Sequence, residues 1–389
     1  MKIAYFSPLN PLRSGISDYS EELLPYLSKY AEIDLFVDFE PTNPVILKNF
    51  KIYDYRKFKK LRKNYDVALY HMGNSPYHKF IYYTLIKYPG VVVLHDWVLH
   101  HFFASLRKFR YLKELLYAYG KRGIDIGLRV LTGVDSSSRE KVYFTYPLNK
   151  HVIKASVGVI AHSEYIKSRI ELNYPDKKVI KINSHCPDFI IKGWNIPQNL
   201  RKKYGFEEDE FIILTPGKLT PNRRVDKILQ AISLLTIPYK KLKYVVVGEV
   251  FPCVGYLVKR QGIYNFVKFT GFTKFKDFYN YIALADVCVL LRYPTAGETS
   301  AALVKVMGMG KPCLVSNVDW YSELPSECVI KIDVNDYEVE QIYEYLKLLI
   351  ENEHLRRKLG ANAREYIVRF HHVESSAKKY IEFLKQCIR

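Results

Sequence analysis

Short apolar runs alternate with amphipathic segments along the whole chain, and the runs are nearly continuous rather than alternating apolar with polar residues. Continuous runs of this length are typical of strands buried on both faces, as in a parallel sheet covered by helices. In the first half, the pattern predicts strands at Lys2–Phe6, Glu32–Val37, Val67–His71, Val91–His95, Val157–Ala161 and Lys178–Ile182. This half of the chain is therefore predicted to form one α/β domain.

The pattern of strands and helices pauses at a looser stretch, Cys186–Asn199, and then restarts. The second set of predicted strands is Phe211–Thr215, Tyr244–Val247, Val267–Thr270, Val287–Leu291 and Pro312–Val315. From about Val339 onward we expect helices, and the last of them repeats apolar residues every three or four positions, which predicts one apolar face. Because 389 residues exceed one typical core, we predict two α/β domains, residues 1–190 and 200–370.

The chain is strongly basic, with 59 lysine and arginine residues against 40 aspartate and glutamate residues and a formal net charge of +19. This surplus favours anionic partners, among them nucleic acid, phospholipid surfaces and phosphorylated small molecules, without choosing among them. The six cysteines form no CxxC pair, and no apolar stretch approaches the roughly 20 residues that span a bilayer. The start shows no signal-peptide pattern, so we expect a soluble, cytoplasmic protein.

The segment Leu291–Pro312 places a carboxylate and two hydroxyl residues, Glu298, Thr299 and Ser300, before a predicted helix that ends at Gly310. The first N–H groups of a helix lack intrahelical partners, so they can hold a phosphate while a neighbouring acid binds sugar hydroxyls. The order strand, loop, helix, strand is a βαβ unit, and ligands of open parallel sheets bind beyond the carboxyl ends of the strands. A nucleotide-sugar suits this arrangement; the alternative is an ordinary helix N-cap.

Two cations follow the predicted strand Phe211–Thr215, in the turn-rich segment PGKLTPNRRVDK. Lys218 and Arg223 are placed there to neutralise a diphosphate through charge-assisted hydrogen bonds. The alternative is a solvated basic loop, which is common in so cationic a chain.

The loop SPLNPLRSGISDYSEELL follows the first predicted strand. Its Gly15 lets the backbone approach a ligand closely, and Ser17 or Asp18 is expected to cap the helix that follows. The loop matches neither the GxGxxG dinucleotide fingerprint nor a Walker P-loop, which counts against a classical dehydrogenase and a P-loop NTPase.

His95 and Asp96 end the run VVVLHD, so we expect both at the rim of the sheet, where a histidine can donate to a sugar hydroxyl. The spacing HDxxxHH matches no strong zinc pattern, and Asp96 is alternatively the cap of a helix that begins near Trp97. His71 and His78, in YHMGNSPYH, are expected in a similar rim loop, either lining an acceptor cleft or acting as ordinary loop residues.

Two stretches combine aromatic and basic residues, Tyr55–Lys63 and Leu106–Tyr119. Rings at a membrane interface with cations near the headgroups would let them dock on anionic lipid. The alternative is a solvated amphipathic helix in each case.

Together these features resemble the GT-B glycosyltransferases, most closely the large family 4 of retaining enzymes, over nearly the whole chain. GKLTPNRR is similar to the family's phosphate loop G-R-L-x-x-x-K-G, which implies that Gly217, Lys218 and Arg223 face the donor phosphates. The run FTGFTKFKDFYNYIALADVCVLL is similar to the family's strand, glycine turn, helix and A-D-V strand, which implies that Gly271 and Phe272 flank the nucleotide base.

The family's E-x7-E element is matched in part: Glu298 resembles the first acid, which contacts the donor sugar, and Lys305 stands in place of the second, which holds the ribose. RSGISDYS is similar to the family's glycine loop near the donor phosphate, and VVVLHD to the segment whose histidine faces the reacting sugar. The implied site has catalytic candidates His95, Glu298, Lys218 and Arg223, donor-binding candidates Gly15, Gly217, Lys218, Arg223, Gly271, Phe272, Glu298, Thr299 and Ser300, and acceptor-side candidates Asp18, His71, Asn74 and Asp96.

The resemblance implies two Rossmann-like domains that face each other across a cleft, an acceptor domain at 1–190 and a nucleotide-sugar domain at 200–370, with a final helix at 372–389 that packs back on the first. It implies transfer of a hexosyl group, with retention, from a nucleotide-diphosphate sugar to a glycan or lipid-linked saccharide, with no cofactor or bound metal. The two basic aromatic stretches add the expectation of a peripheral contact with anionic lipid at the inner membrane face. The alternatives are a sugar-nucleotide epimerase or a glycosyl phosphorylase on the same fold. A nucleic-acid-binding protein is the remaining alternative, although no such binding motif appears in the sequence.

Overall fold

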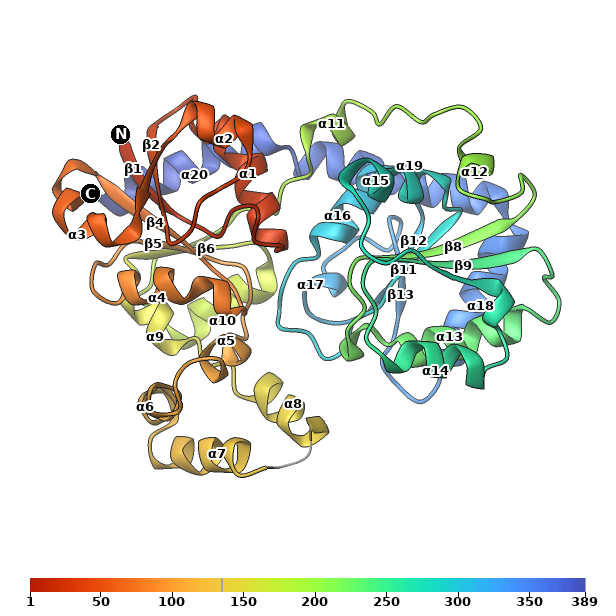
Figure 1. Ribbon diagram of the computed structural model, residues 1–389, viewed down its shortest axis with the longest axis horizontal. Helices are drawn as coiled ribbons and strands as arrows, with labels where there is room; N and C mark the ends of the chain where they lie inside the picture. Colours follow the sequence, from red (N-terminus) through yellow and green to blue (C-terminus); the bar gives the residue numbers. More distant parts are fainter. Residues whose placement is uncertain (134–135, 389) are drawn as a thin grey trace. The chain divides into compact units, whose positions relative to one another are not determined.

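The computed structural model describes residues 1–133 and 136–388, and the chain divides into two compact units (Figure 1). The first unit comprises Met1–His185, Ala296–Thr299 and Val373–Arg389, and the second comprises Cys186–Thr295 and Ser300–His372. Each unit is built on a parallel sheet, which confirms the predicted fold class. No sequence pattern indicated that the short segment Ala296–Thr299 would group with the first unit.

The first unit contains a seven-stranded parallel sheet in the order β3-β2-β1-β4-β5-β6-β7. Its strands are β1 (Lys2–Phe6), β2 (Glu32–Val37), β3 (Lys51–Asp54), β4 (Val67–Met72), β5 (Val91–Leu94), β6 (Gly158–Ala161) and β7 (Val179–Lys181). Strand β1 pairs with β2 and β4, and in this register Ile3 lies between Ile33 and Val67. The sequence missed only β3 among these strands, because this four-residue edge strand is half exposed and lacks a continuous apolar run.

Helices cover both faces of this sheet, which is why its strands are apolar throughout (Figure 1). One face carries α1 (Gly15–Leu27), α2 (Pro44–Asn49) and α20 (Val373–Ile388), and the other carries α4 (Lys79–Leu85), α5 (His100–Ala104), α9 (Lys150–Ala155) and α10 (Glu164–Asn173). Helix α20 packs on α1, and the hydroxyls of Tyr19 and Tyr380 are 2.8 Å apart. Arg389, the last residue of the expected helix 372–389, lies outside the described residues.

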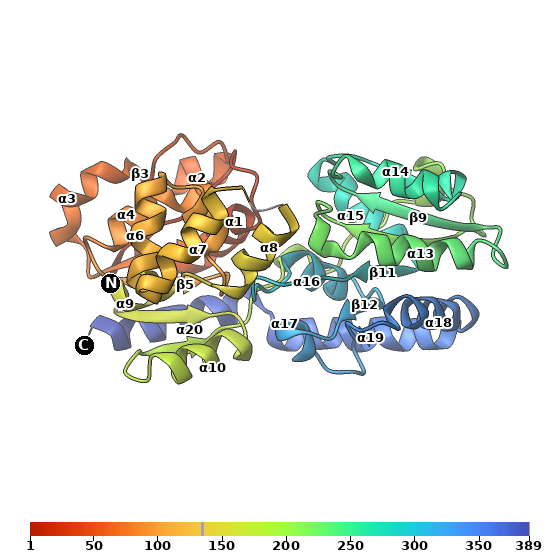
Figure 2. The ribbon, with the colours of Figure 1, turned by 90° about the horizontal axis from the view of Figure 1, so that it is seen from below.

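Between β5 and β6 the chain inserts a helical extension, α6 (Lys108–Tyr119), α7 (Lys121–Leu131) and α8 (Ser136–Thr145) (Figures 1 and 2). Helices α6 and α7 cross closely at Gly123, where an added Cβ would lie 2.1 Å from the carbonyl oxygen of Leu115. None of the helices in the described part of the chain combines the length and hydropathy needed to span a membrane.

The second unit contains a six-stranded parallel sheet in the order β10-β9-β8-β11-β12-β13. Its strands are β8 (Phe211–Pro216), β9 (Leu242–Val247), β10 (Val267–Phe269), β11 (Val287–Leu290), β12 (Cys313–Ser316) and β13 (Ile330–Ile332). One face is covered by α13 (Val225–Leu235), α14 (Cys253–Arg260) and α18 (Glu338–Glu351), and the other by α12 (Leu200–Lys203), α15 (Phe275–Leu284), α16 (Ala301–Gly308) and α19 (Glu353–Phe370). The sequence missed β13, an edge strand of three residues.

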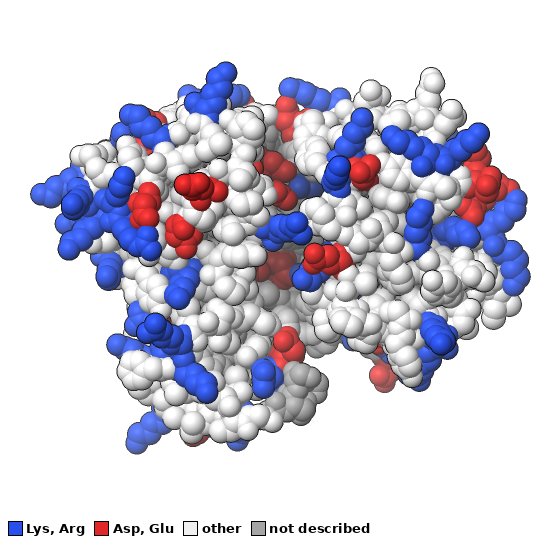
Figure 3. Space-filling model, in the orientation of Figure 1, with Lys and Arg blue, Asp and Glu red and all other residues white. Residues whose placement is uncertain are grey.

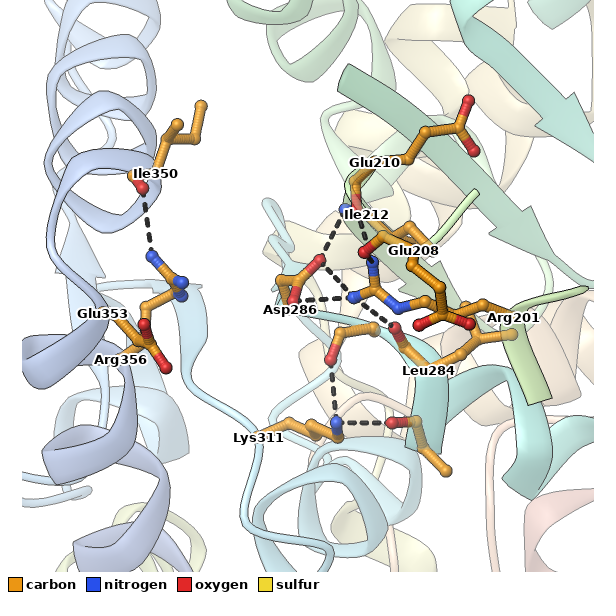
Figure 4. A network of polar contacts seen from close by, with 12 residues as sticks. Arg201, Glu208, Glu210, Ile212, Leu284, Asp286, Lys311, Ile350, Glu353 and Arg356 are labelled. Atoms are coloured by element: carbon orange, nitrogen blue, oxygen red, sulfur yellow. Dashed lines mark hydrogen bonds and ion pairs between the residues drawn. The ribbon is translucent and has the colours of Figure 1, made fainter. Parts of the chain in front are cut away.

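A polar network fixes the amino ends of the strands in this sheet (Figure 4). The Nη2 atom of Arg201 lies 2.9 Å from both carboxylate oxygens of Asp286, which also accepts a bond of 2.8 Å from the N–H of Ile212. The amino group of Lys311 donates to the carbonyl oxygen of Ala283 at 2.6 Å. These cations are therefore structural, and they lie at the edge of the sheet opposite the loops that follow the strands.

Candidate functional site

The strand order of the second sheet reverses between β8 and β11, since β9 and β10 extend the sheet on one side of β8 and β11 begins the other side. Ligands of open parallel sheets bind at such a switch point, beyond the carboxyl ends of the strands. The loops that leave β8 and β11 are joined there. The N–H of Tyr293 donates to the carbonyl oxygen of Asn222 at 2.7 Å. The side-chain amide of Asn222 donates to the carbonyl oxygen of Pro294 at 3.0 Å.

Arg223 ends a 3-10 turn, Pro221–Arg223, in the first of these loops, and only 8% of it is exposed. Its Nη1 atom is buried and has no hydrogen-bond partner. Burial, and then the positive charge of Arg292, lower the pKa of Arg223 to about 9. A solvated basic loop, the alternative left open by the sequence, is therefore wrong for Arg223. A buried cation of this kind is unfavourable until an anion accompanies it.

Lys218 differs from Arg223 although both follow the same strand. Its side chain is 67% exposed, and its amino group lies 3.4 Å from the carboxylate of Glu249. The loop therefore presents one buried cation and one solvated cation that has an acidic neighbour.

Three glycines line the carboxyl edge of β8, β9 and β10. The N–H of Gly217 donates to the carbonyl oxygen of Val247 at 2.7 Å, and Gly248 forms an isolated bridge with Gly271. At Gly248 the φ angle is +144°, and an added Cβ would lie 2.6 Å from the carbonyl of Gly217, so only glycine fits. The sequence singled out Gly217 and Gly271 but missed Gly248, although a glycine directly after an apolar run marks a strand end. Phe272, beside them, is 62% exposed.

The loop that carries Glu298 is held by one hydrogen bond within the loop and by another to a residue far away in the sequence. The carboxylate of Glu298 accepts from the N–H of Ala296 at 2.7 Å, and the carbonyl oxygen of Ala296 accepts from the N–H of Val98 at 2.9 Å. Ser300 is the N-cap of α16, because its hydroxyl accepts from the N–H of Leu303 at 3.2 Å. Thr299 lies between these two positions and is partly exposed.

His71 and His95 form a buried pair in the first unit. The Nδ1 atom of His71 lies 3.0 Å from Nε2 of His95, and the two residues are 0% and 9% exposed. The expected rim loop is wrong for His71, which belongs to β4. His95 directly follows β5 at the rim of the sheet, as predicted, but the ring of Tyr19 in α1 covers it, with 5.0 Å between the ring centroids. Burial lowers the pKa of both imidazoles well below the usual range, so both are neutral near pH 7.

The same tyrosine ring contacts two further histidines that the sequence analysis missed. His162 and His185 lie 5.1 and 4.3 Å from Tyr19, measured between ring centroids. A signal was present, because His71, His95 and His162 each stand at the carboxyl end of one of three neighbouring strands, β4, β5 and β6.

His78 lies in the loop that follows β4, as predicted, but its side chain is buried there. It ends the 3-10 turn Pro76–His78, and burial lowers its pKa to about 4. Its Nε2 atom has no hydrogen-bond partner, and a Cβ added at Gly73 would lie 3.1 Å from its ring.

Asn74 and Asp96 meet beyond β4 and β5. A carboxylate oxygen of Asp96 accepts from the N–H of Asn74 at 2.8 Å, and the Asn74 side chain accepts from the N–H of Phe102 at 3.0 Å. Helix α5 begins at His100, so the suggested helix start near Trp97 with Asp96 as its cap is wrong. Asp96 ties two loops together instead.

Gly15 is the first residue of α1, and nothing lies within 4 Å of a Cβ added there. The expected cap is wrong, because Ser14 caps the helix by accepting from the N–H of Ile16 at 3.1 Å. Ser17 is fully buried, and Asp18 is exposed and accepts from the amide of Asn10 at 3.2 Å.

Within residues 1–133 and 136–388, no group of three or more His, Cys, Asp or Glu side chains is arranged to hold a metal ion. Two surface hollows lie elsewhere. One of about 500 Å³ is lined by α13 and α14 residues, among them Leu229 and Arg260, and one of about 370 Å³ lies beside Tyr65 and Tyr88. Neither contains a residue of the predicted site, whose chemistry lies in the loops beyond the strands.

Comparison with known proteins finds a family model that matches part of the chain and a relative that matches nearly all of it. Residues 197–366 match the model of the family described as glycosyl transferases group 1. An uncharacterized glycosyltransferase of Methanocaldococcus jannaschii is 23% identical, over 97% of this chain and 96% of its own length.

Solved structures show the same fold. The sucrose-phosphate synthase from Thermosynechococcus elongatus has a TM-score of 0.69 at 14% identity, covering 99% of this chain and 98% of that chain. HepE of Anabaena, solved in complex with UDP and glucose, has a TM-score of 0.62 at 14% identity, covering 99% of this chain and 100% of that chain. The two parallel-sheet units and these structural likenesses show the fold of the GT-B glycosyltransferases, and the similarity of residues 197–366 to the group 1 model, with that of the whole chain to a glycosyltransferase, supports a transferase enzyme.

Proposed function

We propose that this enzyme, as a retaining member of family 4, transfers a hexosyl group from a nucleotide-diphosphate sugar to a hydroxyl of a glycan or lipid-linked saccharide. In this proposal residues 200–370 bind the donor and residues 1–190 bind the acceptor. The leaving group is a nucleoside diphosphate, on which negative charge develops as the glycosidic bond to the donor breaks. Groups that stabilise this charge supply most of the acceleration.

The observation that carries the proposal is the buried guanidinium of Arg223 at the switch point between β8 and β11. Its unpartnered Nη1 atom is a strong donor for which the unliganded protein offers no acceptor. A diphosphate oxygen at this position would receive a charge-assisted hydrogen bond. Lys218, which is solvated, can move to a second phosphate oxygen, and the N–H groups near Thr299 and Ser300 at the start of α16 add partial positive charge.

The sugar is assigned to Glu298 and His95. The carboxylate of Glu298 accepts sugar hydroxyls, and the neutral imidazole of His95 donates to a hydroxyl or to the transferred group. Gly271 and Phe272 flank the base, and Gly15 faces the donor phosphate. Asp18, His71, Asn74 and Asp96 remain the acceptor-side assignment, and His71 acts there by holding His95 rather than by exposed contact.

The test is the double variant Lys218→Ala with Arg223→Ala, measured as turnover with saturating donor. We expect a loss of at least about a hundredfold, in the range found when a preorganised charge-stabilising group is removed. The control is Lys202→Ala with Lys203→Ala, which removes the same charge from exposed positions of α12 in the same unit. Unchanged turnover in the first double variant would remove the assignment.

A lipid-linked acceptor also requires contact between the enzyme and a membrane. In this proposal a basic surface of the first unit binds the inner face of the bilayer. Exposed cations gather over the segment around α3 (Phe58–Leu61), as Figure 3 shows, at Arg56, Lys57, Lys59, Lys60, Arg62 and Lys63. On α6 the ring of Phe109 is 80% exposed. We expect co-sedimentation with phosphatidylglycerol vesicles that is lost in Lys59→Glu with Lys60→Glu. Equal binding to neutral phosphatidylcholine vesicles would contradict this assignment.

A further inference from the structure

Arg224, the residue after Arg223, has an unusual backbone conformation. Its φ and ψ angles are 55° and 31°, in the left-handed region, between the turn Pro221–Arg223 and the first residue of α13, Val225. A residue with a Cβ is strained there, and glycine is the usual occupant. Something in the surrounding structure must therefore hold Arg224 in place.

The side chain of Arg224 is held by Glu338, the first residue of α18. The Nε atom of Arg224 lies 2.9 and 3.1 Å from the two carboxylate oxygens, and Nη2 bonds the second of them as well. Glu338 is fully buried, and the Arg224 side chain is 23% exposed. The amino end of α18 adds partial positive charge beside the carboxylate. This is a fork-shaped, charge-assisted pair with little solvent around it.

Because of this pair, the residues on both sides of Arg223 in the sequence are hydrogen-bonded to other elements. On one side, Asn222 is bonded to the loop after β11 through Tyr293 and Pro294. On the other side, Arg224 is bonded to α18, which packs on α13. The two neighbours of Arg223 are thus fixed to different elements, and its guanidinium lies beside Gly217, where an added Cβ would be 3.6 Å from Nη2.

We propose that Glu338 is a positioning residue for donor binding: it holds Arg224 in the left-handed conformation and thereby aims the guanidinium of Arg223 at the diphosphate. This inference rests on the proposed function, in which Arg223 binds that diphosphate. Glu338 itself touches neither donor nor acceptor.

The test is Glu338→Gln, which keeps the shape of the side chain and removes its charge. The readout is the Kd for UDP, GDP and ADP, measured by calorimetry on folded protein, for whichever nucleotide the wild-type protein binds. We expect the Kd to rise about tenfold or more, since a charged hydrogen bond that orders the binding loop is lost. The control is Glu340→Gln, an exposed position in the same first turn of α18, which should leave the Kd unchanged.

A second variant separates positioning from a general structural role. In Glu338→Gln with Arg224→Gly, the glycine adopts the left-handed conformation without help, so the Kd should return to within about threefold of wild type. This variant also gives an answer if Glu338→Gln alone does not fold.

Two results would overturn the inference: an unchanged Kd in Glu338→Gln, or a folded double variant in which the Kd does not recover. If wild-type protein and all variants bind none of the three nucleotides, the proposed function fails and the inference fails with it. That result differs from the first two, because in those the wild-type protein still binds.

Discussion

Replacing Arg223 by methionine should stabilise the ligand-free protein while it removes nucleotide binding. The guanidinium is buried with an unpartnered Nη1 atom, and its pKa is lowered to about 9. A group that is charged in both the folded and unfolded states, but whose folded pKa is lower, costs stability at every pH below that folded pKa. Hence the full cost is present at pH 7.

The size of this cost follows from the same value. Each unit by which burial lowers the pKa of a base corresponds to about 1.4 kcal/mol, so lowering the pKa of the guanidinium from its usual range to about 9 represents a cost of several kcal/mol. Methionine fills a similar volume but loses the polar contacts of the guanidinium, which offsets part of the gain. Exchanges of buried ionic groups for apolar ones stabilise proteins by about 1–4 kcal/mol, and we expect a value in this range.

The assay is urea unfolding of the ligand-free protein, followed by tryptophan fluorescence. Trp194 and Trp320 lie in the second unit and report on it, whereas Trp97 lies in the first. The control Lys218→Met removes a charge from the same loop at an exposed position, so its free energy of unfolding should change by less than about 0.5 kcal/mol. A destabilised Arg223→Met variant, or one that UDP, GDP or ADP still stabilises as it does the wild-type protein, would refute the reasoning.

Three further predictions concern stability and the donor loops. Because burial lowers the pKa of His71 well below its usual range and that of His78 to about 4, their contribution to stability is present above about pH 6.5 and is lost as the pH falls. The free energy of unfolding should therefore fall by about 1.4 kcal/mol per pH unit for each such group, and a flat profile from pH 7 to 5 would contradict this. Gly248→Ala places a Cβ 2.6 Å from the backbone of the preceding loop and should abolish nucleotide binding, whereas Gly255→Ala meets open space and should not. Lys305→Glu supplies an acceptor for ribose hydroxyls and should lower the Kd of the nucleotide; a higher Kd would show that Lys305 does not stand in the ribose position.

The strands of this protein could be predicted from the sequence wherever they are buried on both faces, because such strands are apolar throughout. The central strands were all predicted, and the two that were missed, β3 and β13, are short edge strands. The loops of the site could be placed as well, because the position of a residue after a strand fixes the edge of the sheet at which it lies.

The burial of side chains in those loops could not be predicted from the sequence, because the residues that cover them are distant in the chain. His95 ends a strand, as predicted, but Tyr19 from α1 covers it, and nothing near His95 in the sequence signals that cover. Arg223 stands in a loop that reads as basic and solvated, yet Arg292 and other distant segments enclose it. Arg224 and Glu338 are 114 residues apart, so their pairing depends on the packing of α13 against α18.

The central claim is that Arg223 receives the diphosphate of the donor, and a crystal structure of the protein with UDP, or with GDP or ADP if that nucleotide binds better, tests it most directly. The account predicts a phosphate oxygen about 3 Å from Nη1 of Arg223, with the base beside Gly271. A nucleotide bound elsewhere, for example in the hollow lined by Leu229 and Arg260, with Nη1 still unpartnered, would contradict it.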